Sequence, residues 1–99
     1  MIYESKTTRQ FKKDIKKAQR QGKDLSRLFY VIDILKNGEK LPDNFLDHRL
    51  RGFKYEFREC HIEPDFLLVY EFKNEYLILK LIRLGSHSEL FSNNSLHTK

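Results

Sequence analysis

The spacing of apolar residues changes from helical to strand-like near the middle of this chain. In residues 8–21, Phe11, Ile15 and Ala18 form one apolar stripe at helical spacing. In residues 53–57 aromatic and charged residues alternate, as they do in a strand with one face in water. A chain that is helical in its first part and strand-forming in its second predicts an α+β fold, with helices covering one face of a sheet.

A second helix is expected directly after the first. Asp24 is a suitable N-cap, and the Asn37–Gly38 pair can end the helix. Its apolar face is wider than that of the first helix and comprises Leu25, Leu28, Phe29, Ile32 and Leu35. Because only residues 22–24 separate the two helices, we expect an antiparallel helical hairpin.

The second half of the chain predicts an antiparallel meander of at least three strands. The first strand starts at residue 53 and runs to the turn at residues 63–65, residues 66–72 form the second strand and residues 76–84 the third. Pro64 suits the second position of a β-turn between the first two strands. The opening residues "MIYE" can add a short strand at the edge of the sheet.

The 99 residues fit a single domain, which we place at residues 1–91, followed by a polar tail at 92–99. Residues 41–52 are expected to form a loop. The longest apolar stretch, Phe66–Tyr70, is too short to cross a bilayer, and the N-terminus lacks the apolar segment of a secretory signal. The single cysteine allows no intrachain disulfide. We therefore expect a cytoplasmic protein that has no membrane partner.

Basic residues are concentrated in the first part of the chain. Residues 1–40 contain eleven Lys and Arg but five Asp and Glu, whereas the whole chain has a net charge of +5. Five of these basic side chains share the predicted first helix: Lys12, Lys13, Lys16, Lys17 and Arg20. Such a surface suits contacts with nucleic-acid phosphates, although a solvated lysine face gives the same pattern.

The positions of three histidines favour a functional site. His48 lies in a predicted loop, His61 at a strand end and His87 just beyond another strand. A metal site is not expected, because Cys60 and His61 are neighbours in a strand and point to opposite faces. No CxxC or HExxH spacing is present either, so we expect no metal and interpret Cys60 as a core residue.

Histidine, carboxylate and guanidinium groups together suit cleavage of RNA by its own 2′-hydroxyl. The reaction needs a base for the 2′-OH proton, a cation for the phosphate charge and an acid for the leaving 5′-oxygen. Histidine titrates near neutral pH and can serve as acid or base. Asp65 and Arg83 are close to the predicted strand ends that carry the histidines. No metal or other cofactor is required, and DNA lacks the reacting hydroxyl.

Three sequence blocks carry a resemblance to a known family. They are "DHRLRG" at residues 47–52, "FRECHIEPDFLLVY" at 57–70 and "LIRLGSHSELF" at 81–91. Together with the basic first helix, they resemble the YafQ branch of the RelE/ParE toxin superfamily. Members of this branch are ribosome-dependent mRNA endonucleases from bacterial type II toxin–antitoxin modules.

The resemblance implies two helices on a twisted antiparallel sheet of three to four strands. It also implies a cleft formed by His48, His61, Asp65, Arg83, His87 and Phe91. The family favours His87 as general acid and Arg83 as phosphate ligand. The base is left open among His48, His61 and Asp65, which can also position the substrate.

Substrate contacts are implied for Phe66 and Phe91, of which Phe66 replaces a tryptophan common in relatives. Partners implied by the resemblance are mRNA, ribosomal RNA held by the basic helix, and a cognate antitoxin.

Several alternatives stay open at this point. The same fold can act by association, as in gyrase-targeting relatives or in a general RNA-binding domain, without cutting RNA. Arg83 shares the parity of Leu79 and Leu81, which predicts a core-facing side chain unless the strand contains a bulge. A salt bridge to a nearby Glu would explain Arg83, turn formation would explain Asp65, and core packing would explain Phe91.

Overall fold

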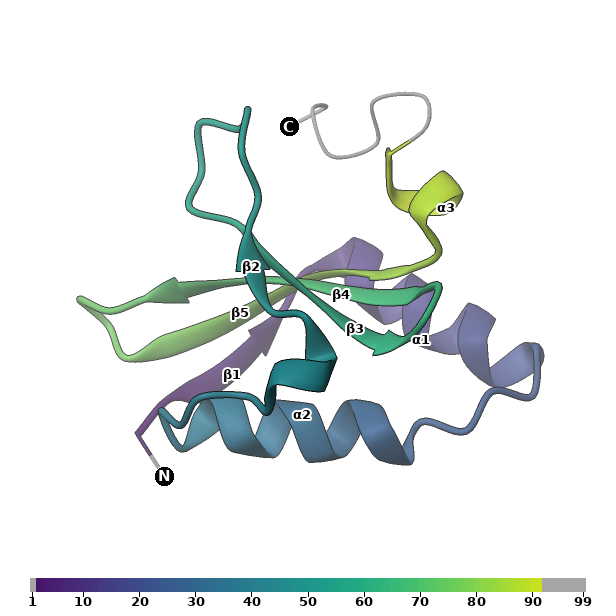
Figure 1. Ribbon diagram of the computed structural model, residues 1–99, viewed down its shortest axis with the longest axis horizontal. Coiled ribbons are helices and arrows are strands. Elements are labelled where there is room, and N and C mark those ends of the chain that lie inside the picture. Colours follow the sequence, from purple (N-terminus) through teal and green to yellow (C-terminus); the bar gives the residue numbers. More distant parts are fainter. Residues whose placement is uncertain (1, 92–99) are drawn as a thin grey trace.

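The computed structural model describes residues 2–91, which form a five-stranded sheet with helices on both faces (Figure 1). The elements are β1 (Glu4–Thr7), α1 (Arg9–Arg20), α2 (Ser26–Lys36), the 3-10 helix η1 (Asp43–Phe45), β2 (His48–Arg49), β3 (Arg58–Glu63), β4 (Phe66–Lys73), β5 (Ile78–Gly85) and α3 (His87–Phe91). The predicted α+β fold is confirmed. The tail predicted at 92–99 lies outside the described residues.

The sheet is mixed, so the prediction of a purely antiparallel sheet is wrong at one edge. The strand order is β1-β5-β4-β3-β2, and β1 runs parallel to β5 with Glu4 opposite Ile78 and Thr7 opposite Leu81. The short edge strand expected at the N-terminus therefore exists, shifted to Glu4–Thr7. Its partner lies more than seventy residues away, so no local pattern shows the pairing direction.

The first strand of the predicted meander exists but starts later than expected, because β3 runs from Arg58 to the turn after Glu63 and does not include residues 53–57. The aromatic rings of residues 53–57 pack on each other instead, with centroids 5.7 Å apart for Phe53–Phe57 and 5.3 Å apart for Tyr55–Phe57. The two-residue strand β2 lies in the predicted loop and pairs His48 with Glu59 of β3. This pairing places His48 at the edge of the sheet.

Both predicted helices are present, and their ends are set by side chains and glycine. The Thr8 hydroxyl accepts a hydrogen bond from the Phe11 N–H at the start of α1. The prediction of Asp24 as the N-cap of α2 is wrong by one residue, because Leu25 is the N-cap; the Asp24 carboxylate accepts a hydrogen bond from the N–H of Ser26, the first residue of α2. Gly22 takes a positive φ of 75° between the helices, which a residue with a Cβ adopts only with strain. Within residues 2–91, no helix is long and apolar enough to cross a membrane.

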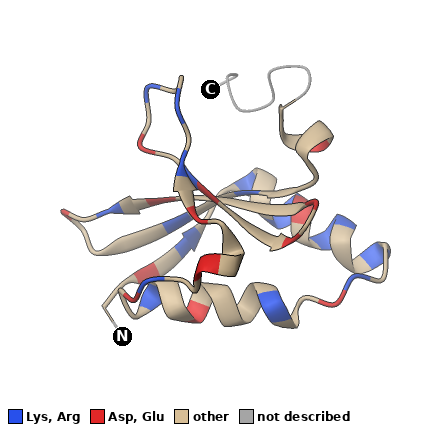
Figure 2. Cartoon of the chain, viewed as in Figure 1, with Lys and Arg blue, Asp and Glu red and all other residues tan. Residues whose placement is uncertain are grey.

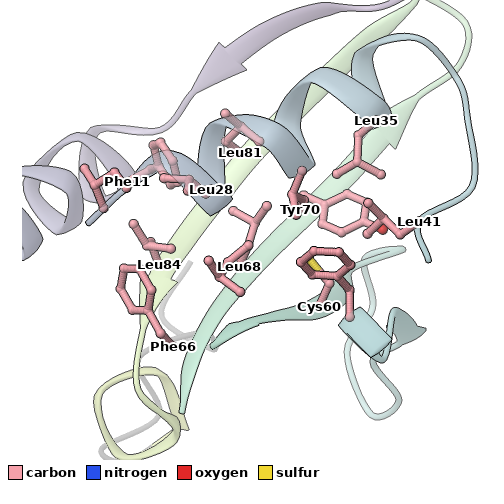
Figure 3. Packing of buried hydrophobic residues seen from close by; sticks show 14 of the residues in the cluster. Phe11, Leu28, Leu35, Leu41, Cys60, Phe66, Leu68, Tyr70, Leu81 and Leu84 are labelled. Carbon is pink, nitrogen blue, oxygen red and sulfur yellow. The ribbon is translucent and has the colours of Figure 1, made fainter. Parts of the chain in front are cut away.

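The sheet separates two apolar clusters. The larger one joins α1 and α2 to one face of the sheet through residues such as Phe11, Leu28, Leu68, Tyr70 and Leu81 (Figure 3). The smaller one, on the opposite face, contains Phe57, Leu67, Val69, Ile82 and Leu90. Residues 50–57 and α3 therefore cover the face away from α2, as Figure 1 shows.

A β-bulge in β5 explains which face of the sheet carries the Arg83 side chain. Tyr70 pairs with Leu81 but Val69 pairs with Arg83, so Ile82 is the extra residue. Leu81 and Leu84 therefore both pack in the helix-side cluster. Arg83 instead starts from the face that Val69 shares with α3, and the bulge alternative is the correct one.

Candidate active site

Three histidines from three different elements meet on the sheet face away from α1 and α2. His48 of β2 lies beside His61 of β3, with ring centroids 6.4 Å apart. His61 lies beside His87 of α3 at 5.9 Å, and His87 lies beside Phe91 at 5.8 Å. We refer to His48, His61 and His87 as the histidine cluster. The structure thus brings the predicted histidines together.

Asp65 fixes the position of His87. Its Oδ1 accepts a hydrogen bond from the His87 backbone N–H at 3.0 Å and lies 3.3 Å from the His87 Nδ1. The hydrogen bond from the backbone N–H, followed by the contact with the ring, lowers the pKa of Asp65 from its ordinary value. Since an ionised carboxylate can only accept, Nδ1 carries a proton and Nε2 is left for another partner.

A buried carboxylate that the sequence did not single out lies between the other two histidines. Glu59 is only 3% exposed, and its Oε1 is 3.3 Å from His48 Nε2 and 3.7 Å from His61 Nε2. In the described part of the chain, its Oε2 has no hydrogen-bond partner. Glu59 lies in a run of charged residues in the sequence, which reads as a wet strand face. This unpartnered oxygen is an exception among buried carboxylates, which are normally hydrogen-bonded, and it sets Glu59 apart as a candidate site residue.

The hydrogen bonds of His48 define its proton arrangement. Its Nδ1 donates to the Leu46 carbonyl at 2.7 Å, because a carbonyl oxygen cannot donate. Its Nε2 faces the Glu59 carboxylate. Both ring nitrogens of His48 are therefore directed at groups of the protein itself.

A second polar network holds the segment that carries His48. The Asp47 carboxylate accepts hydrogen bonds from the Arg58 guanidinium and from the Tyr70 hydroxyl. Burial, followed by the bond to Asp47, raises the pKa of the Tyr70 hydroxyl, and the same carboxylate raises the pKa of Arg58. Since Tyr70 belongs to the main core, this network anchors β2 to the body of the fold.

The Arg83 side chain starts from the sheet face that carries Glu59 and the histidine cluster, but its guanidinium is bound by a residue of α1. The register pairs Arg83 with Val69 and Val69 with Glu59, so these side chains start from one face of the sheet. The Arg83 guanidinium forms an ion pair with Asp14 of α1, with Nε 2.9 Å from Oδ2. A salt bridge was one open explanation for Arg83, although its partner is an aspartate and not a glutamate.

The two predicted aromatic contacts have different surroundings. Phe91 is 36% exposed and its ring adjoins His87, so it is accessible from the cluster. Phe66 is 4% exposed and packs in the helix-side cluster, with the Lys23 ammonium 4.8 Å from its ring centre. Strand parity turns Phe66 towards the helices, but its ring also lines a groove that contains Asp65 and Glu89, so its contact with the substrate stays a prediction.

The five basic residues of α1 are exposed, as the sequence predicts. Figure 2 shows Lys and Arg positions in blue along α1. One of these five, Lys17, forms an ion pair with Glu89 of α3 through its ammonium group. Lys13, Lys17 and Arg20 line a groove of about 410 Å³ together with Asp14, Arg83 and other residues; we call it the α1 groove. The basic face of α1 is thus continuous with Arg83.

The carboxylates of Asp65 and Glu89 hold α3 in place. We expect both to lose these contacts when they are protonated at low pH. The Lys17 ammonium and, to a lesser extent, the Ser86 N–H lower the pKa of Glu89. The contacts with His87 lower the pKa of Asp65, as described above. A carboxylate whose pKa is lowered by folding stabilises the fold above its unfolded pKa and ceases to do so as the pH falls through its folded pKa. We expect the amides of residues 87–90 to lose hydrogen-exchange protection below about pH 4.

The control for this acid effect is a variant with Asp65→Asn and Glu89→Gln. Its residues 87–90 should already exchange faster at neutral pH and should show no further loss of protection in acid. Exchange rates of the wild-type protein that follow only the intrinsic pH dependence would contradict the role of both carboxylates.

Among the described residues, no set of side chains around the histidine cluster could bind a metal ion. Among residues 2–91, no three His, Cys, Asp or Glu side chains lie so that they could hold one ion. Cys60 packs in the helix-side core while the ring of His61 contacts His48 and His87, so the two neighbours point to opposite faces as predicted. Burial raises the pKa of the Cys60 thiol, which keeps it protonated.

Comparison with known proteins identifies one family. Residues 3–92 match the family described as "Bacterial toxin of type II toxin-antitoxin system, YafQ". The chain is 37% identical over 83 residues to the mRNA interferase toxin YafQ of Escherichia coli strain K12, a match that covers 83% of this chain and 88% of that protein.

Solved structures agree with this match over nearly the whole chain. A metal-bound toxin from Helicobacter pylori has a TM-score of 0.87 at 44% identity and covers 92% of this chain and 100% of its own. The E. coli DinJ–YafQ complex has a TM-score of 0.82 at 34% identity, with 90% and 98% covered. The sequence match runs from before β1 to beyond α3 and includes the whole histidine cluster. This chain belongs to the YafQ family of bacterial type II toxins.

Proposed function

We propose that this toxin cuts mRNA on the ribosome by acid–base catalysis, without a metal ion. The observation that carries the proposal is the arrangement of His61 between a buried carboxylate on one side and His87 on the other. The two imidazoles contact different carboxylates: His61 contacts Glu59, which it shares with His48, and His87 contacts Asp65. Two separately supported imidazoles suit a reaction that needs one base and one acid.

His61 is the base in this proposal. Its Nε2 faces Glu59, so the imidazolium formed when His61 takes the 2′-OH proton is stabilised by a buried negative charge. His48 contacts Glu59 from the other side, and both of its ring nitrogens face protein groups, Leu46 and Glu59. We assign Asp65 to the positioning of His87 and not to the base, because its Oδ1 contacts both the backbone N–H and the ring of His87.

His87 is the general acid. Asp65 binds its Nδ1 and orients the ring, and the exposed Nε2 can then deliver a proton to the departing 5′-oxygen. Arg83 neutralises the charge on the phosphate as the bond breaks. Phe91, beside His87, stacks on a neighbouring base of the substrate.

The basic face of α1 supplies affinity for ribosomal RNA. Lys12 and Lys16 are exposed, and Lys12, Lys13, Lys16 and Arg20 add positive charge next to the α1 groove. We expect the double variant Lys12→Gln/Lys16→Gln to bind ribosomes more weakly and to reduce the slope of log K against log salt by about 1–2, because each lysine releases about one counterion. Ribosome co-sedimentation at several salt concentrations measures this slope, and an unchanged slope would contradict the role of α1.

The partner of the toxin is a cognate antitoxin, since the similar E. coli YafQ is solved in a complex with DinJ. The toxin and its substrates then meet in the bacterial cytoplasm. An antitoxin that covers the histidine cluster or the α1 groove keeps the toxin inactive.

Purified toxin added to ribosomes translating a defined mRNA tests the proposal. We expect new mRNA ends that map to the ribosomal A site and carry 2′,3′-cyclic phosphate on the upstream fragment. An mRNA with 2′-deoxyribose at the mapped position should resist cutting, because it lacks the nucleophile. Arrest of translation with intact mRNA would instead indicate a toxin that acts by association.

A further inference from the structure

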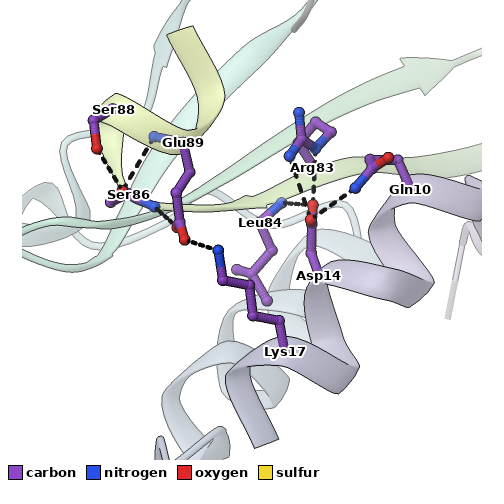
Figure 4. Close-up of polar contacts among 8 residues, drawn as sticks. All are labelled: Gln10, Asp14, Lys17, Arg83, Leu84, Ser86, Ser88 and Glu89. Carbon is purple, nitrogen blue, oxygen red and sulfur yellow. Dashed lines mark hydrogen bonds and ion pairs between the residues drawn. The ribbon is translucent and has the colours of Figure 1, made fainter. Parts of the chain in front are cut away.

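Both carboxylate oxygens of Asp14 in α1 accept hydrogen bonds from the end of β5 (Figure 4). Its Oδ2 accepts hydrogen bonds from Arg83 Nε at 2.9 Å and from the Leu84 N–H at 2.8 Å. Its Oδ1 accepts bonds from Arg83 Nη2 at 3.3 Å and from Gln10 Nε2 at 3.3 Å. Asp14 and Arg83 are 7% and 11% exposed, so water screens their attraction weakly.

We propose that Asp14 is a positioning residue that fixes the Arg83 guanidinium for contact with the substrate phosphate. The inference deepens the proposed function and rests on it, because it assumes that Arg83 binds the phosphate. A guanidinium has five N–H groups, and Asp14 takes two of them in a two-point contact. The remaining three are held in a fixed plane at the edge of the α1 groove.

The carboxylate is itself held by the fold. The Leu84 N–H and the Gln10 amide bind it independently of Arg83, so it keeps its place when a phosphate approaches the guanidinium. Arg83 also follows the β-bulge directly, where strand pairing alone defines its direction poorly. A guanidinium bound at two points loses less freedom when it binds an oxyanion than a free arginine side chain does.

The α1 groove leads from the basic helix to the catalytic end of the sheet. Its walls include Lys13 and Arg20 besides Arg83, and its Glu89 also lines an adjoining groove of about 350 Å³ that contains Asp65. The two acidic side chains of the α1 groove are paired, Asp14 with Arg83 and Glu89 with Lys17. An RNA backbone that follows this path passes Arg83 before it reaches His87.

A purely structural role is the rival explanation, because Asp14 also joins α1 to β5 through Leu84. The two roles differ in what they predict for the variant Asp14→Asn. Asparagine retains an oxygen for the Leu84 N–H but loses the charge that orients Arg83. If Asp14 acts through Arg83, the variant lowers the single-turnover cleavage rate about 10- to 100-fold, with little change in the half-saturating toxin concentration.

The experiment is a double-mutant cycle with cleavage on programmed ribosomes. Asp14→Asn is measured in the wild-type protein and in the variant Arg83→Ala, with the exposed acid Asp33→Asn of α2 as the matched control. We expect Asp14→Asn to cost nothing further once Arg83 is absent, and Asp33→Asn to cleave as the wild-type protein does. Equal losses in both backgrounds would overturn the inference and assign Asp14 a structural role.

The NMR signal of the Arg83 Nε–H gives a second readout that does not depend on residual activity. In the wild-type protein we expect this proton to be protected from exchange, and in Asp14→Asn we expect the protection to be lost while the backbone amide spectrum is retained. A signal that exchanges as fast as that of an exposed arginine would overturn the inference. A wild-type protein that cuts no mRNA refutes the proposed function, whereas a fully active Asp14→Asn variant refutes only the role of Asp14.

Discussion

The substitution His87→Ala is expected to lower mRNA cleavage on ribosomes by about 10²- to 10⁴-fold, the usual contribution of a general acid. The loss follows from the position of the ring, which Asp65 binds at Nδ1 so that only Nε2 is free to protonate the leaving oxygen. Folding should survive, because the side chain of His87 is exposed and its backbone bond to Asp65 does not need the ring. Single-turnover cleavage and thermal unfolding measured on the same preparation check both parts.

A substrate with a better leaving group separates the acid role from a binding role. A 5′-bridging sulfur leaves as a thiolate, which needs no protonation, so His87→Ala should cut this substrate nearly as fast as the wild-type protein does. The partner variant Asp65→Asn should show a smaller loss on the ordinary substrate and the same rescue. A folded His87→Ala protein that is equally slow on both substrates would contradict general-acid catalysis by His87.

Much of this fold could be predicted because its signals are local. The two helices are bounded by Thr8 and Gly22 and by Asp24 and Gly38, and they lie within one or two residues of the predicted ranges. The hairpin of β4 and β5 was predicted for the same reason, since both strands are apolar runs separated by a polar turn. Histidines at strand ends could be selected as site candidates, because strand ends on a rigid sheet commonly carry function.

The features that could not be predicted depend on contacts between distant residues. The parallel pairing of β1 with β5 and the bulge at Ile82 leave no trace in a short sequence window. The rings of Phe53 and Phe57 alternate as in a strand, but they bury their surface against each other in a loop. Asp14 and Glu59 look like ordinary surface acids in the sequence and are buried only because Arg83 and two imidazoles meet them in the fold.

Glu59→Gln is expected to lower mRNA cleavage by about 10²-fold or more while the protein stays folded. Glutamine has nearly the shape of glutamate, so it fills the same buried position, but it removes the negative charge that faces His48 and His61. The imidazolium that forms when His61 takes the 2′-OH proton then loses its stabilising partner. Single-turnover cleavage measured on equal concentrations of the variant and the wild-type protein checks this.

Stability distinguishes this functional role from a packing role. Burying an ionised carboxylate costs free energy, and Glu59 recovers only part of it because its Oε2 has no partner among the described residues. We therefore expect the thermal midpoint of Glu59→Gln to equal or exceed that of the wild-type protein, whereas a purely structural carboxylate would leave the variant less stable. The exposed acid Glu75 in the β4–β5 turn provides the matched control, and Glu75→Gln should change neither rate nor stability. Full activity of a folded Glu59→Gln protein would show that the imidazoles need no buried charge, and the base would then have to be assigned without Glu59.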